Sequence, residues 1–134
     1  DDFKRYNDRY GHQQGDAALR AVAQVTRDVL RRAVDTVARY GGEEFAAVLP
    51  GTSAADAQLM AERVRKEVMA LGLPHATSQV MGVVSVSIGV ASSGARSDIE
   101  AEELLRLADE ALYAAKNSGK NRVFLAPEPT PNSP

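Results

Sequence analysis

The sequence lacks three features that would assign it to particular classes of protein. It has no cysteine, which excludes disulfides and thiolate zinc sites and agrees with a reducing, cytoplasmic location. Its longest apolar stretch, VMGVVSVSIGVA, is far shorter than the ~20 residues that a membrane-spanning helix needs. The net charge of −2 is too small to indicate a nucleic-acid or membrane-surface partner. We therefore expect a cytoplasmic domain that contacts neither nucleic acid nor membrane and binds its partners at specific sites.

The length and the two ends of the chain predict its domain organisation. A chain of 134 residues suits one domain and can bury roughly two-thirds of the surface that its unfolded form exposes. The last nine residues, APEPTPNSP, contain four prolines and almost no apolar side chain, a composition that favours disorder. We predict one folded domain at residues 1–125 and a disordered, proline-rich tail at residues 126–134.

Apolar residues recur at two periodicities that alternate along the chain. Helical spacing predicts a helix from about Asp16 to Ala33, a second that begins near Ser53, and a third through Leu104–Ala115. Strand patterns lie in TVARY, FAAVL, VVSVSIGVA and RVFL. The serines and glycine on the second face of VVSVSIGVA leave room for a packed helix. The predicted fold class is α+β, with helices packed on one face of a mainly antiparallel sheet.

The stretch RYGGEEF, residues 39–45, predicts a hairpin with adjacent carboxylates at its tip. Gly41 and Gly42 suit a tight turn, because glycine reaches positive φ without steric cost. A turn has no need of two like charges side by side, so Glu43 and Glu44 indicate an electropositive ligand at the tip. A solvated hairpin turn is the alternative interpretation of this stretch taken alone.

Four stretches of the sequence together resemble one known family. DDFKRYNDRYGHQQGDAAL, RYGGEEF, VSVSIGVA and ADEALYAAKNSGKN follow one another in the order and spacing of the GGDEF family of diguanylate cyclases, here in the GGEEF form. The resemblance covers almost the whole chain up to Leu125. It implies a palm-like nucleotidyl cyclase fold that condenses two GTP molecules into cyclic di-GMP, with release of pyrophosphate, between two facing copies of the domain.

The resemblance assigns catalytic roles to the tip of the hairpin. Glu43 is implied to be a ligand of Mg²⁺ or Mn²⁺ and to help deprotonate the 3′-hydroxyl, since such hard cations take carboxylate oxygens. Glu44 points away from Glu43 if a strand begins there. Gly41 and Gly42 let the backbone approach the nucleotide where a Cβ would collide. These four residues are the expected catalytic set.

Family members carry a second metal-binding aspartate that this sequence does not contain. It lies two residues before the position of Asp1, on a central strand that follows the family's first helix. Asp1 matches the next acid of that motif, which is not a ligand. We therefore expect a metal site that is half present and a sheet that lacks its middle strand.

The resemblance also implies a substrate site. Lys4, Lys116 and Lys120 match phosphate-binding positions of the family, although Lys120 stands where arginine is frequent and loses its bidentate fork. Asn7 and Asp16 match the residues that recognise guanine, whose N–H groups a carboxylate accepts. Each assignment has a structural alternative. Lysines near a helix C-terminus favour the helix dipole, and Asp16 is placed to cap a helix N-terminus.

A second site is implied by the spacing of RRAVDTVARYGGEEF. Arg32 and Asp35 form an Arg-x-x-Asp motif five residues before Gly41, which is the position of the family's product-inhibition site. Arg63 matches the second arginine that holds the cyclic dinucleotide there. Arginine suits this role because it forks onto phosphate and stacks on guanine. The alternatives are a charge at a helix C-terminus for Arg32 and a solvated helix face for Arg63.

Three functions are compatible with the sequence: a diguanylate cyclase, a catalytically silent receptor for cyclic di-GMP or GTP, and a dimerisation module. The intact hairpin favours the cyclase, because a receptor would have no need of Glu43. The family resemblance further implies an upstream sensor or receiver domain, through which a longer protein could be anchored to a membrane. Neither histidine has a predicted role. His12 is expected to pack inside the fold, and His75 lies in a polar loop.

Overall fold

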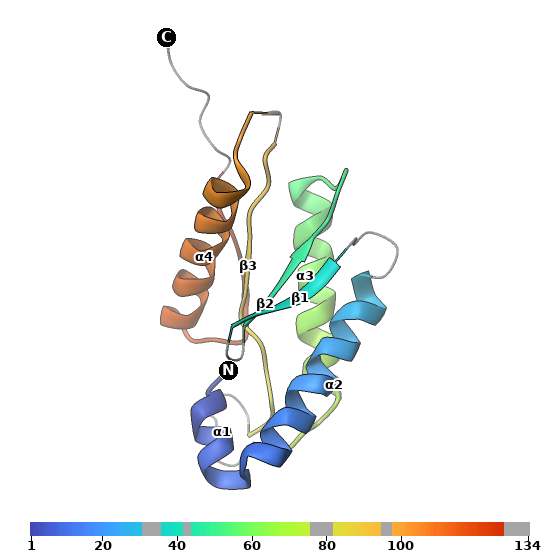
Figure 1. Cartoon of the computed structure of the whole chain (residues 1–134), viewed down its shortest axis with the longest axis vertical. Coiled ribbons are helices and arrows are strands. Elements are labelled where there is room, and N and C mark those ends of the chain that lie inside the picture. The colour runs from blue at the N-terminus through green and yellow to red at the C-terminus, as the bar shows by residue number, and fades with distance from the viewer. Residues whose placement is uncertain (31–35, 42–43, 76–81, 95–97, 128–134) are drawn as a thin grey trace.

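The computed structural model describes residues 1–30, 36–41, 44–75, 82–94 and 98–127, with side chains described outside residues 36–41. In chain order the elements are α1 (Phe3–Tyr10), α2 (His12–Leu30), β1 (Thr36–Gly41), β2 (Glu44–Val48), α3 (Ala54–Ala70), β3 (Ile88–Val90), α4 (Ala101–Asn117) and β4 (Val123–Leu125). Figure 1 shows α4 and α3 on opposite sides of β3, with α1 at the end of the molecule where the chain begins.

The first two helices meet at a glycine. Gly11 has a φ of 87°, which lets the chain turn between α1 and α2. Gly15 lies inside α2, and a Cβ there would stand 1.8 Å from Oδ1 of Asn7 on α1. Helix α2 therefore begins at His12, four residues before the predicted start, because the glycine serves helix packing and does not break the helix. The capping role considered for Asp16 is wrong, since Asp16 is the fifth residue of α2.

The predicted hairpin is confirmed. Strands β1 and β2 pair antiparallel, with Thr36 opposite Val48 and Gly41 opposite Glu44. The register shifts between Arg39 and Gly41, so the pairing is irregular beside the tip. Gly42 and Glu43, which connect the strands, lie outside the described residues.

Helix α3 confirms the second predicted helix and carries much of the core. Ser53 is its N-cap, and its Oγ accepts a hydrogen bond from the backbone N–H of Asp56 at 3.1 Å. Val64 and Val68 on its inner face are buried against α2 and the chain that leads into β3. The main core cluster consists of Tyr6, Ala18, Val22, Leu30, Val64, Val68 and Val84.

Strand β3 has a helix on each side. Ile88 packs against the core cluster beneath α2 and α3, whereas Gly89 faces the backbone of α4. A Cβ on Gly89 would lie 2.2 Å from the carbonyl oxygen of Ala108 and 2.4 Å from the amide nitrogen of Leu112. The room predicted for a packed helix is thus confirmed and filled by α4. The expectation that helices cover one face of the sheet is wrong at β3, because both of its faces are apolar or small.

The strands form two separate pairs within the described part of the chain. Strands β3 and β4 pair parallel, with Ile88 opposite Val123, and no ladder joins them to β1 and β2. The predicted strand VVSVSIGVA is regular only at Ile88–Val90. The α+β fold class is confirmed, with one antiparallel and one parallel pair among the described strands. Residues 128–134 of the predicted tail lie outside the described residues.

The contact between β3 and α4 predicts the effect of one methyl group. Gly89→Ala should lower the free energy of unfolding by about 3 kcal/mol, because the atoms in its way are backbone atoms that cannot rotate aside. Gly51→Ala is the control: it adds a Cβ in open space at a φ of 65° and should cost about 1 kcal/mol. Urea unfolding of the two variants measures the difference. Equal losses would show that α4 can move away.

Candidate nucleotide site

The tip of the hairpin lies beside the C-terminal end of α4. The carboxylate of Glu44, the first residue of β2, is 4.0 Å from the ammonium of Lys116 in the last turn of α4. Both side chains are about two-fifths exposed, so the pair stays accessible to a ligand. The structure thus brings one predicted catalytic residue to one predicted phosphate-binding residue. The lysine also favours the helix dipole, and the two roles are compatible.

The loop after α4 carries Lys120 to the same region. The Lys120 ammonium forms an ion pair with the carboxylate of Asp2, which is almost fully buried. The backbone N–H of Asn121 donates to the carboxylate of Asp1 at 3.0 Å. Ser85 and Ser87 donate to that carboxylate too, at 2.9 and 2.7 Å. The first two residues therefore tie the loop to the start of α1 and to the chain before β3.

The two predicted guanine-binding residues lie at the contact between α1 and α2. Asn7 Oδ1 is buried and, among the described residues, has no hydrogen-bond partner. Asp16 follows Gly15 directly, is exposed, and lines one part of a groove of about 430 Å³ between α2 and β2. The groove extends to Phe45, the residue after Glu44. Its lining residues are Asp16, Leu19, Arg20, Ala23, Gln24, Arg27 and Phe45.

The remaining predicted residues are Lys4 and those of the product-inhibition site, and the structure describes only some of them. Lys4 is exposed on α1, two residues after the Asp2 that pairs with Lys120. Arg63 is exposed on α3, where its Nε lies 3.3 Å from Oε1 of Glu67. Arg32 and Asp35 lie outside the described residues, so the product-inhibition site stays a prediction.

The metal prediction rests on a residue that the structure does not describe. Within the described ranges, no three His, Asp or Glu side chains gather closely enough to hold a metal ion. Glu43, the predicted ligand, lies outside those ranges. The donor type still fits the prediction, since Mg²⁺ is commonly held by one or two carboxylates together with substrate phosphates.

Sequence reasoning missed the role of His75. Its side chain is fully buried, its Nε2–H donates to the carbonyl oxygen of Asp2 at 3.1 Å, and its ring meets the edge of Tyr6 at 5.2 Å between centroids. His12, expected to pack inside, is exposed at the start of α2. The nearby HATSQVMG segment is polar in part, which is why the burial of His75 could not be read from its neighbours.

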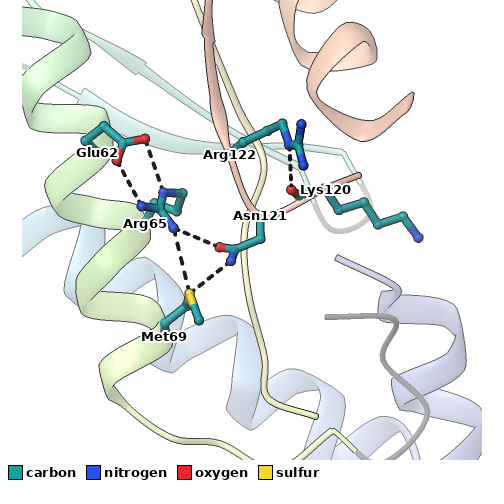
Figure 2. A network of polar contacts seen from close by, with 6 residues as sticks. All are labelled: Glu62, Arg65, Met69, Lys120, Asn121 and Arg122. Carbon is teal, nitrogen blue, oxygen red and sulfur yellow. Dashed lines mark hydrogen bonds and ion pairs between the residues drawn. The ribbon is translucent and has the colours of Figure 1, made fainter. Parts of the chain in front are cut away.

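A polar network between α3 and the loop after α4 was also missed. Figure 2 shows Arg65 between Glu62, Met69 and Asn121. Arg65 donates two hydrogen bonds to the carboxylate of Glu62, at 3.1 and 2.9 Å, and one to Oδ1 of Asn121 at 3.3 Å. The bond from Arg65 holds the pKa of Glu62 below its usual value. Arg65 and Asn121 are 56 residues apart, so no local pattern signals their contact.

Comparison with known proteins places the chain in a family. The family model described as the GGDEF domain of diguanylate cyclases matches residues 1–122. The chain is 42% identical over 134 residues to diguanylate cyclase A of Treponema denticola, and 44% identical over 124 residues to the response regulator PleD of Caulobacter vibrioides. These alignments cover 99% and 92% of this chain, but 35% and 27% of the relatives. The chain thus spans about a third or less of their length.

Solved structures agree with this family. The GGDEF domain of DgcB from Caulobacter crescentus, in complex with c-di-GMP, superposes with a TM-score of 0.81 at 38% identity, covering 93% of this chain and 72% of that one. The active GGEEF domain of a diguanylate cyclase from Vibrio cholerae gives a TM-score of 0.78 at 30% identity, covering 96% and 79%. The chain belongs to the GGDEF family of diguanylate cyclase domains, and the predicted palm-like cyclase fold is confirmed. None of the described helices is long and apolar enough to cross a bilayer.

Proposed function

We propose that this domain condenses two molecules of GTP into cyclic di-GMP. In this reaction each 3′-oxygen attacks the α-phosphorus of the other GTP, and each bond to the departing pyrophosphate breaks. The observation that carries the proposal is the position of Lys116 beside Glu44, near the tip of a hairpin with the GGEEF sequence. A solvated turn would have no need of a cation from a helix 72 residues away.

Three lysines would supply the positive charge that a triphosphate needs. Lys116 and Lys120 flank the end of α4, and Lys4 lies near the start of α1, close to Asp2. Each lysine offers a point charge to phosphate oxygens, and the acidic partners of Lys116 and Lys120 hold them in place until a nucleotide arrives. Gly41 and Gly42, which lack a Cβ, would let the backbone approach the nucleotide.

A divalent cation, Mg²⁺ or Mn²⁺, would be held by Glu43 and by an aspartate upstream of Asp1. When bound, the cation would polarise the α-phosphate and lower the pKa of the attacking hydroxyl. Glu43 would accept the proton of that hydroxyl, and Glu44 keeps Lys116 beside the tip of the hairpin. Glu43 suits the role of metal ligand, since hard cations prefer oxygen ligands such as carboxylates.

Guanine would be recognised at the contact of α1 and α2. Asp16 is exposed in the groove and is not used as a helix cap, so its carboxylate can accept from the N1–H and N2–H₂ groups of guanine. Oδ1 of Asn7, which has no partner among the residues that the structure describes, would be a second acceptor for the same donors. Adenine lacks this pair of donors, and a buried acceptor left unpaired makes the wrong base costly.

The product would form between two copies of the domain and regulate them. One domain offers one hairpin and one guanine site, so two GTP molecules require two facing domains in a homodimer. Arg32, Asp35 and Arg63 would bind cyclic di-GMP away from the hairpin and hold the domains apart, which inhibits without competing with GTP. DgcB, a relative in structure, is itself described in complex with c-di-GMP. The relative PleD is a response regulator. By analogy, a receiver or sensor domain in a longer protein would supply the signal that controls this domain.

The first test concerns the metal ligand. In the full-length protein, Glu43→Gln should lower the rate of cyclic di-GMP formation at least about 100-fold, because the carboxylate that holds the cation is lost. Turnover should require Mg²⁺ or Mn²⁺. Glu102→Gln, an exposed glutamate in the first turn of α4, is the control and should leave the rate unchanged. Wild-type turnover by Glu43→Gln would disprove the metal assignment, whereas a parent protein that binds GTP without turning it over would favour a silent receptor.

The second test concerns the choice of base. Asp16→Ala should weaken GTP binding by about 1–3 kcal/mol, the range expected for lost charge-assisted hydrogen bonds, and should narrow the preference over ATP. Asp28→Ala is a matched control on α2, since Asp28 accepts from Gln24 and does not line the groove. Competition binding with both nucleotides measures the effect. An unchanged preference for GTP would remove Asp16 from the site.

The third test concerns product inhibition. Arg32→Ala should abolish inhibition by added cyclic di-GMP while the initial velocity stays nearly unchanged, and Arg63→Ala should weaken inhibition less. Arg106→Ala, an exposed arginine on α4, serves as the control. Initial rates at several concentrations of GTP and product decide the case. If Arg32→Ala remains as inhibitable as the parent, these arginines are only surface charges.

A further inference from the structure

The loop that follows α4 has a backbone that it would not adopt by itself. Lys120 and Asn121 have φ values of 63° and 45°, and Gly119 before them has 128°. Left-handed backbone is unfavourable for lysine, although asparagine tolerates it, and two such residues in succession persist only where their surroundings hold them. Lys120, a predicted phosphate-binding residue, is one of the two.

Contacts within the loop hold one side of it. The backbone N–H of Lys120 donates to the carbonyl oxygen of Ala115 in α4 at 3.0 Å. The Nε of Arg122 donates to the carbonyl oxygen of Lys120 at 3.0 Å, and its guanidinium covers Gly119 so closely that a Cβ there would lie 2.4 Å from Nη2. These contacts fix the peptide of Lys120 but do not reach the side chain of Asn121.

The other side of the loop is held from α3. Oδ1 of Asn121 accepts from Nη1 of Arg65 at 3.3 Å, and Nδ2 lies 3.0 Å from the sulfur of Met69. Arg65 can reach across because its Nε and Nη2 are both bound to Glu62, one turn earlier on the same helix. The fork fixes the plane of the guanidinium, and the side chain is only 17% exposed. Figure 2 shows the Lys120 side chain pointing away from α3 on the far side of this contact.

We propose that Arg65 and Asn121 form a positioning pair for nucleotide binding: Arg65, fixed by Glu62, holds Asn121 and thereby sets the left-handed loop that presents Lys120 to the triphosphate. The inference rests on the proposed function, because it assigns Lys120 to substrate. Neither residue of the pair touches the nucleotide in this arrangement. Loss of the pair leaves the loop tied to the start of the chain, by Asp1 and Asp2, but not through Asn121 to α3, so its left-handed backbone and the position of Lys120 are held less firmly.

The chain contains a matched arginine that lacks the long-range contact. Arg106 on α4 binds Glu103 through the same spacing of three residues, and Glu103 raises the pKa of its guanidinium. Its other ion-pair partner, Glu110, lies on the same helix, and no contact with another element is seen in the part of the chain that the structure describes. Substitution of Arg106 therefore removes an arginine and its fork without touching the loop.

The experiment is a double-mutant cycle in the full-length protein with Mg²⁺. Arg65→Lys keeps the charge but cannot fork onto Glu62 and reach Asn121 together, and Asn121→Ala removes the acceptor. Each single variant should raise the KM for GTP about tenfold with less than about a twofold change in kcat. The double variant should be no worse than either single variant, because both remove one interaction. Arg106→Lys should change neither constant.

Several results would overturn the proposal. They are an unchanged KM in either single variant, effects that multiply in the double variant, or an equal change in Arg106→Lys. Binding of a non-hydrolysable GTP analogue, measured by calorimetry, separates this proposal from the proposed function. If the parent protein binds the analogue but makes no cyclic di-GMP, the proposed reaction fails, and the same cycle in dissociation constants still decides whether the pair positions Lys120. If the parent does not bind the analogue, both fail.

Discussion

The close approach of Gly89 to α4 is the contact on which the site depends. Because Gly89 has no side chain, the strand backbone lies directly against the carbonyl of Ala108 and the amide of Leu112. This contact sets where α4 lies and therefore where it ends. Lys116 in its last turn reaches Glu44, and the loop beyond it runs back to the first residues of the chain.

The site is an arrangement of charges on elements that are each stable for other reasons. Glu44 belongs to a paired strand, Lys116 to a packed helix, and Asp16 to a helix whose inner face forms part of the core. Most of these side chains remain exposed, so the surrounding apolar contacts, and not the charges, hold the elements together. A site built in this way can bind a highly charged ligand without the fold depending on that ligand.

The loop at Lys120 differs from these elements, because its backbone is unfavourable without outside contacts. It is held by carboxylates from the start of the chain and by Arg65 from α3. The same helix carries Arg63, the proposed product-binding residue, on its exposed surface. Helix α3 would therefore contact cyclic di-GMP directly through Arg63, and it would be linked to bound GTP through Asn121 and the Lys120 loop.

The sequence by itself determined the elements whose signals are local. Helical spacing and the Ser53 cap defined α3, two glycines between apolar runs defined the hairpin, and ordered motifs identified the family. Only the tertiary structure decided where α2 begins, that His75 is buried, and that Arg65 meets Asn121. Each of these depends on a contact between residues from different elements. Such contacts leave no periodic trace, because the partner of a side chain is chosen by packing across the fold and not by its neighbours in sequence.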